Sequence, residues 1–153
     1  MIRERPRLAA PGELSEIEEV VISSYGKYLT RMDRPPAPME RDYAEAIENQ
    51  EIWVIGSPVQ GLVSFRTESV GALLIENIAV HPSNQGSGLG RLLMEFAEAE
   101  ATARGLNRLA LYTNEAMIEN LSIYEHLGFS EVARRTEDGY RRIYMEKVLP
   151  PLG

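Results

Sequence analysis

The chain has 153 residues, 44% of them hydrophobic and 25% charged, a composition typical of folded proteins rather than disordered segments. We expect residues 1–153 to form a single domain. The 16 basic and 23 acidic side chains give a formal charge of −7, which disfavours nucleic acid and anionic membranes as partners. The absence of cysteine excludes disulfides, a cysteine acyl-enzyme and cysteine-ligated metals.

No stretch of the sequence is typical of a targeting signal or a membrane span. The N-terminal residues MIRERPRLAAPGELSEIEE contain no apolar run of the signal-peptide type, and a run such as Ala72–Ile75 is far too short to cross a bilayer. We therefore expect a cytoplasmic protein that does not interact with membranes.

The first third of the chain favours helices and the following segment a hairpin. Hydrophobic spacing, prolines and turn residues predict an edge strand, a helix, an extended proline-rich segment, a short helix and two strands. These elements cover Ile2–Leu8, Pro11–Ser24, Arg31–Glu40, Met39–Asn49, Glu51–Ile55 and Leu62–Thr67.

The second half alternates strands with helices. A nearly continuous apolar strand, buried on both faces, is followed by a helix, a strand, a second helix that ends at Gly128-Phe129, and a final hairpin. The expected bounds are Ala72–Val80, Gly88–Arg104, Leu106–Thr113, Asn114–Leu127, Ser130–Arg135 and Arg141–Val148. Crossover units beside hairpins predict a mixed sheet.

A glycine-rich stretch, residues 81–100 (HPSNQGSGLGRLLMEFAEAE), joins the buried strand to an amphipathic helix. Gly86, Gly88 and Gly90 omit side chains where that helix begins. A helix N-terminus has unpaired N–H groups and partial positive charge, so the stretch predicts a phosphate or pyrophosphate site. The dinucleotide fingerprint fails because Arg91 replaces its third glycine, and no P-loop Gly-Lys-Ser/Thr occurs. A tight strand-to-helix turn without a ligand is the alternative.

Two motifs resemble the GCN5-related N-acetyltransferases. QGSGLG, residues 85–90, resembles their Q/R-x-x-G-x-G/A segment, and IENIAV before it resembles their fourth strand. NLSIYEHLGF, residues 120–129, resembles their last helix. The resemblance covers roughly residues 72–147 and implies an α/β (α+β) fold of the acyl-CoA N-acyltransferase type. That fold has a mixed, mostly antiparallel central sheet flanked by about four helices.

The resemblance also implies which residues bind acetyl-CoA, the co-substrate. In this family the glycine segment cradles the pyrophosphate, which assigns that role to Gln85, Gly86, Ser87, Gly88, Leu89, Gly90 and Arg91. A β-bulge near Asn77 is expected to free backbone groups of Ile78, Ala79 and Val80 for the pantetheine arm, with an N–H facing the thioester oxygen. Asn120 is expected to make a polar contact to the same arm.

Tyr124 is the candidate general acid. Acetyl transfer from a thioester to an amine needs a stabilised oxyanion and a proton donor for the leaving thiolate. Tyr124 follows Asn120 by four residues, so both side chains project from one helix face, and the resemblance assigns the acid role to this tyrosine. The alternative is a core tyrosine, because Met117, Leu121 and Tyr124 form an apolar stripe.

Glu76 is the candidate base, acting through a water molecule. It is the only charged residue in Ala72–Val80, and a carboxylate among apolar neighbours tends toward a raised pKa. The alternative is a glutamate on the solvent side of the strand.

The leading hypothesis is an acetyl-CoA-dependent N-acetyltransferase in which a primary amine attacks the thioester directly in a ternary complex. The acceptor is expected to be a small molecule or a peptide. The resemblance in fold, and no motif of these residues, implies that it enters over Tyr25–Met39 and the last hairpin, near Tyr112 and Tyr140. Two isolated histidines predict no metal site, and C-terminal edge strands could pair two copies into a homodimer. A non-catalytic CoA-binding or regulatory module of the same fold is the alternative. A nucleotide-binding partner domain is disfavoured by the missing P-loop lysine.

Overall fold

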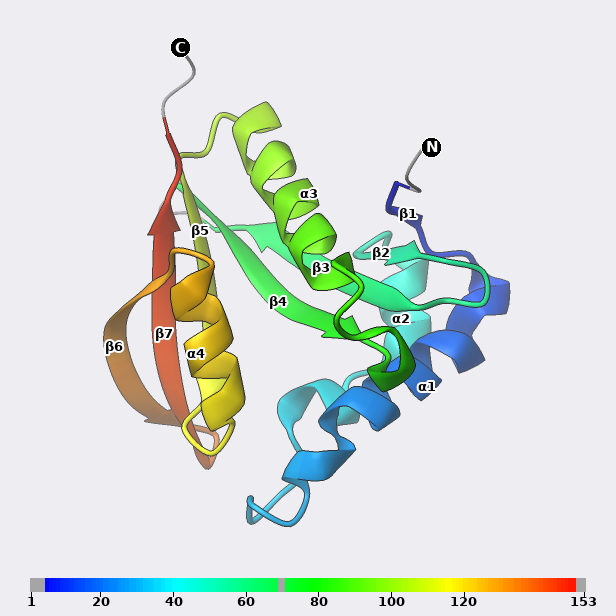
Figure 1. Ribbon diagram of the computed structural model, residues 1–153, viewed down its shortest axis with the longest axis horizontal. Coiled ribbons are helices and arrows are strands. Elements are labelled where there is room, and N and C mark those ends of the chain that lie inside the picture. The colour runs from blue at the N-terminus through cyan, green and yellow to red at the C-terminus, as the bar shows by residue number, and fades with distance from the viewer. Residues whose placement is uncertain (1–4, 69–70, 151–153) are drawn as a thin grey trace. The chain divides into compact units, whose positions relative to one another are not determined.

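The computed structural model describes residues 5–68 and 71–150, whose strands form a seven-stranded sheet in the order β1-β2-β3-β4-β5-β7-β6 (Figure 1). The strands are β1 (Arg7–Leu8), β2 (Ile52–Ile55), β3 (Gly61–Thr67), β4 (Ala72–Val80), β5 (Arg108–Asn114), β6 (Ser130–Glu137) and β7 (Tyr140–Val148). β4 and β5 pair in parallel, whereas β1–β2, β2–β3, β5–β7 and β6–β7 pair antiparallel. The mixed, mostly antiparallel sheet is confirmed.

Four α-helices and four 3₁₀ turns complete the described chain. The α-helices are α1 (Leu14–Tyr25), α2 (Tyr43–Glu48), α3 (Leu89–Ala103) and α4 (Ile118–His126). The 3₁₀ turns are η1 (Pro11–Glu13), η2 (Gly26–Tyr28), η3 (Ala37–Glu40) and η4 (Pro82–Asn84). None of the helices in these residues is both long and apolar enough to cross a membrane.

The chain divides into two compact units, and β4 and α3 each contribute one part to the first unit and the other part to the second. The first contains the residues up to Phe65 and Asn77–Phe96, and the second contains Arg66–Glu76 and the residues from Ala97 onward. The prediction of a single domain stays a prediction.

In the first unit, the beginning of α3 packs against the hairpin β2–β3. The Phe96 ring lies 5.0 Å from the Trp53 ring and 6.1 Å from the Phe65 ring, and Leu93 is fully buried. Gly61 permits this packing, because a Cβ there would lie 3.1 Å from Leu93 Cδ1. The same contacts therefore orient the first turn of α3, which follows the glycine-rich stretch.

In the second unit, β5 and β7 supply a shared buried face. Leu111 pairs with Met145 and Thr113 with Ile143, and all four side chains are buried. The hairpin β6–β7 turns through Asp138 (φ +51°) and Gly139 (φ +82°), where the sequence predicts a turn.

Helix α4 ends where the sequence predicts, in a Schellman motif. The Phe129 N–H donates to the Tyr124 carbonyl at 3.0 Å, the Gly128 N–H donates to the Glu125 carbonyl at 3.1 Å, and Gly128 has φ +99°. The Tyr124 and Phe129 rings meet edge to face at 5.9 Å, which supplies the apolar contact of the motif. The position of Tyr124 is therefore tied to the end of its helix.

Three helices begin later than the sequence predicts. α1 begins at Leu14 rather than Pro11, because Pro11–Glu13 forms the 3₁₀ turn η1. α2 begins at Tyr43 rather than near Met39, because the Asp42 side chain caps it by accepting the Glu45 N–H at 3.1 Å. α4 begins at Ile118 rather than Asn114, because the Asn114 side chain accepts the Ala116 N–H at 2.8 Å and holds a turn before the helix.

Two other expectations for the N-terminal part need correction. The segment Arg31–Glu40 is not wholly extended, since Ala37–Glu40 forms a 3₁₀ turn; proline tolerates the first turn of a helix, where its missing N–H costs little. The edge strand expected over Ile2–Leu8 is only Arg7–Leu8 within the described residues, and residues 1–4 lie outside them.

We expect Gly128→Ala to lower the free energy of unfolding by about 1–2 kcal/mol, because the left-handed backbone at this position disfavours any Cβ. Gly12→Ala is the matched control. A Cβ on Gly12 meets nothing within 4 Å and its φ is not positive, so this change should be neutral or slightly stabilising. Urea unfolding of both variants measures the difference, and equal stabilities would contradict the role of Gly128.

Candidate functional site

The glycine-rich stretch leads from the end of β4 into the first turn of α3 (Figure 1). Gly86 (φ +85°) and Gly88 (φ +88°) adopt the left-handed backbone that side chains resist. Gly90 differs, because it lies within α3 and a Cβ there would approach only Val80 Cγ2, at 4.0 Å. The fold itself therefore requires glycine at the first two positions but not at Gly90.

The stretch presents a row of unpaired peptide N–H groups. The first bond of α3 joins the Leu92 N–H to the Gly88 carbonyl at 3.0 Å, and the Ser87 N–H donates to the Asn84 carbonyl. Among the described residues, no acceptor pairs with the N–H groups of Gly86, Gly88, Leu89, Gly90 or Arg91. Together with the positive end of the helix dipole, such a row is suited to bind a phosphate or pyrophosphate.

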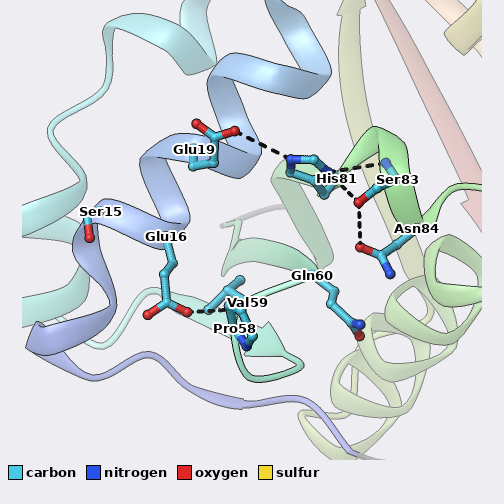
Figure 2. Close-up of a pocket in the computed structure, with 9 residues that line it drawn as sticks. All are labelled: Ser15, Glu16, Glu19, Pro58, Val59, Gln60, His81, Ser83 and Asn84. Carbon is cyan, nitrogen blue, oxygen red and sulfur yellow. Dashed lines mark hydrogen bonds and ion pairs between the residues drawn. The ribbon is translucent and has the colours of Figure 1, made fainter.

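The base of this stretch is anchored by His81 (Figure 2). The His81 N–H donates to the Gln60 carbonyl at 2.8 Å, and its Nδ1 accepts the Ser83 N–H at 3.2 Å, which caps η4. Its Nε2 lies 3.5 Å from a carboxylate oxygen of Glu19 on α1. A hydrogen bond from the Ser23 hydroxyl and the neighbouring His81 together lower the pKa of Glu19. These contacts connect the glycine-rich stretch to α1 and to the turn before β3.

A cavity of about 400 Å³ lies beside this anchor and is shown in Figure 2. Glu16 and Glu19 of α1 face it, and Glu16 accepts the Val59 N–H at 2.8 Å. His81, Ser83 and Asn84, at the start of the glycine-rich stretch, line the same cavity.

The candidate cofactor residues on β4 contact other parts of the first unit. The Gln85 side-chain amide donates to the Val80 carbonyl at 3.2 Å, so two of the candidates bond to each other. The Ile78 carbonyl accepts the Tyr25 hydroxyl at 3.2 Å, and Ala79 is buried. The parallel ladder joins Ala72–Ile75 to β5, and β4 continues beyond it to Val80.

The sequence does not predict the hydrogen bonds of the buried Asn77 side chain on β4. The Asn77 side chain accepts the Tyr25 hydroxyl at 2.8 Å and donates to the Tyr43 hydroxyl at 2.9 Å. The Tyr43 hydroxyl donates to the Pro38 carbonyl at 2.5 Å. The only signal in the sequence is a single amide side chain in an apolar strand, and it does not identify the two tyrosines.

The second unit contains the three remaining candidate residues, which are Glu76, Asn120 and Tyr124. Asn120 and Tyr124 lie one helical turn apart on α4, and both are half-buried rather than in the core. The Asn120 amide lies 3.9 Å from Met117 Sδ. The partial exposure of Tyr124 argues against the alternative of a simple core tyrosine, although its ring packs on Phe129.

Glu76 does not have the apolar surroundings that its strand predicts. Its side chain is 26% exposed, and its carboxylate lies 3.6 Å from the Arg66 guanidinium. The structure thus places Ile78–Val80 and Gln85–Arg91 in the first unit, and Glu76, Asn120 and Tyr124 in the second.

A family comparison agrees with this geometry. Residues 48–131, more than half of the chain, match the family described as "Acetyltransferase (GNAT) domain". The chain belongs to the GNAT family of acetyltransferases. The matched residues include β4, the glycine-rich stretch, α3 and α4, which carry every candidate site residue of this GNAT chain.

Individual GNAT proteins resemble parts of this chain. The mycothiol acetyltransferase of Beutenbergia cavernae is 39% identical over 62 residues, which are 40% of this chain and 21% of that protein. The [ribosomal protein bS18]-alanine N-acetyltransferase of Escherichia coli is 41% identical over 59 residues, which are 39% of this chain and 40% of that protein. The chain thus spans between about a fifth and two fifths of the length of these relatives.

A solved GNAT structure shares the fold over nearly the whole chain. The PaiA N-acetyltransferase of Thermoplasma acidophilum, in complex with coenzyme A, superposes with a TM-score of 0.74 at 16% identity. The superposition covers 96% of this chain and 99% of that one. It confirms the predicted acyl-CoA N-acyltransferase architecture.

One buried tyrosine of this GNAT chain, Tyr43, predicts a loss of stability at alkaline pH. Burial raises the pKa of Tyr43 above the value of about 10 for an unfolded tyrosine. Its contribution to stability is therefore complete below about pH 10 and is lost as the pH rises toward the folded pKa. Urea unfolding at about pH 8 and about pH 10.5 should show a smaller decrease for Tyr43→Phe than for wild type. Equal decreases would exclude this tyrosine as a source.

Proposed function

We propose that this chain is an acetyl-CoA-dependent N-acetyltransferase that acetylates a primary amine by direct attack within a ternary complex. The observation that carries the proposal is the row of unpaired N–H groups of Gly86, Gly88, Leu89, Gly90 and Arg91 at the start of α3. A pyrophosphate supplies several anionic oxygens, which are suitable acceptors for such a row of donors. Family membership and the names of the relatives support the same reaction class.

We propose that residues of the first unit bind coenzyme A. The N–H row, with Gln85 and Ser87 at its base, would hold the pyrophosphate, and the room beside Gly90 lets a ligand approach the backbone. The end of β4, at Ile78, Ala79 and Val80, would bind the pantetheine arm through its peptide groups. When bound, acetyl-CoA supplies an acyl group activated as a thioester.

The reaction conserves atoms without a covalent enzyme intermediate. The nitrogen lone pair of the neutral amine forms a bond to the thioester carbonyl carbon, and the oxygen carries the negative charge. The carbon–sulfur bond then breaks, the sulfur takes a proton, and the nitrogen loses one. The products are an acetamide and the thiol of coenzyme A.

We assign the proton donor to Tyr124 and the polar contact to the cofactor arm to Asn120. The side chains lie one turn apart on α4, are half-buried, and are fixed by a helix that ends in a Schellman motif. We assign the base to Glu76 through a water molecule, which its 26% exposure allows to reach it. The Arg66 guanidinium lies 3.6 Å from this carboxylate and is itself 60% exposed.

The acceptor is proposed to be a small-molecule or peptide amine. The net charge of −7 attracts cationic partners and repels nucleic acid, which supports a protonated amine that loses its proton at the site. A cytoplasmic location, a homodimer, and the absence of a metal or membrane partner stay predictions.

Release of free thiol from acetyl-CoA, measured with a panel of amines, tests the proposed function. An N-acetyltransferase releases thiol only when a suitable amine is present, and the acetamide appears in equal amount. A protein that binds coenzyme A tightly but never releases thiol would be the non-catalytic module instead.

We predict that Gly90→Asp raises the stability of the chain and weakens coenzyme A binding by about tenfold or more. A carboxylate in the first turn of α3 complements the helix dipole, but it competes with pyrophosphate for the same N–H groups. Gly90→Ala is the matched control and should stabilise by about 0.5–1 kcal/mol with a smaller effect on binding. Calorimetry and thermal melts measure both effects. Unchanged affinity in Gly90→Asp would contradict the proposed cradle.

We predict that Tyr124→Phe lowers kcat by about 10²-fold and leaves the affinity for acetyl-CoA nearly unchanged. The phenylalanine keeps the ring contact with Phe129, so the end of α4 should be preserved and only the proton donor lost. Steady-state kinetics with the best amine of the panel measure kcat, and calorimetry measures affinity. A variant with full kcat would remove the acid role from Tyr124.

A further inference from the structure

A chain of buried hydrogen bonds crosses the first unit and ends on the backbone of β4. The Tyr25 hydroxyl, at the end of α1, lies 2.8 Å from Asn77 Oδ1 and 3.2 Å from the Ile78 carbonyl oxygen. Asn77 Nδ2 donates to the Tyr43 hydroxyl at 2.9 Å, and that hydroxyl donates to the Pro38 carbonyl at 2.5 Å. The bonds thus link three segments that are far apart in sequence.

The network is buried, and both polar atoms of its central amide are hydrogen-bonded. Tyr25 is 7% exposed, and Tyr43 and Asn77 are each 4% exposed. Asn77 accepts with its oxygen and donates with its nitrogen, so breaking one bond leaves a buried polar atom without a partner. A buried network that is satisfied in this way restricts its members to one arrangement.

The network acts on both peptide groups that flank the Ile78 α-carbon. Hydrogen bonds to two tyrosines restrain the Asn77 side chain. The carbonyl of Asn77 and the N–H of Ile78 belong to one planar peptide group, so this restraint also acts on the Ile78 N–H. The Tyr25 hydroxyl directly contacts the Ile78 carbonyl, which shares a plane with the Ala79 N–H. The direction of the Ile78 N–H is therefore restrained from both sides.

We propose that Tyr25, Asn77 and Tyr43 are positioning residues that hold the Ile78 peptide groups in the orientation required by the acetyl thioester. The inference rests on the proposed function, in which the end of β4 binds the acyl-bearing arm. A backbone N–H that is held in advance stabilises the developing oxyanion without reorganising during the reaction. None of the three side chains needs to touch the reacting atoms.

The far end of the network adds a second role. Pro38 lies in the turn η3, within the segment Tyr25–Met39 over which the resemblance in fold predicts that the acceptor enters. The Tyr43 bond to Pro38 holds this segment to the same amide that restrains Ile78. The network therefore also fixes the acceptor segment with respect to the thioester-binding end of β4.

Tyr25→Phe tests the proposal, because it removes the hydroxyl and keeps the ring. We expect kcat to fall about tenfold. We also expect binding of acetyl-CoA to weaken while binding of coenzyme A, which has no thioester carbonyl, stays unchanged. Tyr43→Phe acts one bond further from Ile78 and should give a smaller decrease in kcat. It also keeps the test decisive if Tyr25→Phe fails to fold.

Val21→Ala is the matched control. Val21 lies on α1, is 1% exposed and takes no part in the network, so its truncation destabilises the same helix without removing a hydroxyl. We expect it to leave kcat and the difference in affinity between acetyl-CoA and coenzyme A at wild-type values.

Three outcomes would overturn the inference. If the wild-type enzyme is active and both Tyr25→Phe and Tyr43→Phe keep its kcat, the inference is overturned but the proposed function is not. Equal losses in Tyr25→Phe and Val21→Ala would show a merely structural role. A wild-type protein that binds no coenzyme A would overturn the proposed function and this inference together.

Discussion

The proposed chemistry depends on peptide N–H groups that the fold leaves unpaired. A helix cannot satisfy its first N–H groups internally, and most proteins cap them with a side chain. Here Gly86 and Gly88 bring the backbone into α3 through positive φ angles, and the first turn retains its free donors. Two residues of α3 hold this turn in place: the fully buried Leu93, and Phe96, whose ring packs on the rings of Trp53 and Phe65 from β2 and β3. The row of donors on this turn is therefore suited to the anion-binding role that we propose for it.

Support for this stretch comes from local contacts at both ends. At its base, His81 connects η4 to α1 and to the Gln60 carbonyl, and the Gln85 side chain returns to β4. At the other end, α3 begins with the bond from Leu92 to Gly88. The stretch is therefore restrained although it is rich in glycine, which reduces the ordering cost that a ligand would otherwise meet on binding.

Local patterns predicted much of the fold because they depend on neighbours in sequence. Helical spacing and the Gly128-Phe129 stop predicted the end of α4, and its Schellman hydrogen bonds confirm it. The starts of α2 and α4 were wrong, since Asp42 and Asn114 side chains compete for backbone N–H groups in ways that periodicity does not reveal. The surroundings of Glu76 were also predicted wrongly. The composition of β4 predicted apolar neighbours, whereas the Glu76 carboxylate lies 3.6 Å from the Arg66 guanidinium.

The sequence by itself determined the order of elements, the glycine-rich stretch at the start of α3 and the family, since these depend on short-range spacing and residue type. Only the tertiary structure brought Tyr25 to Asn77 across 52 positions and Tyr43 to Asn77 across 34. It also decided that Tyr124 is half-buried beside Phe129. Such contacts arise from the packing of segments that are distant in sequence. Hydrophobic periodicity reports local structure, so it does not reveal how α1 and α2 pack against β4.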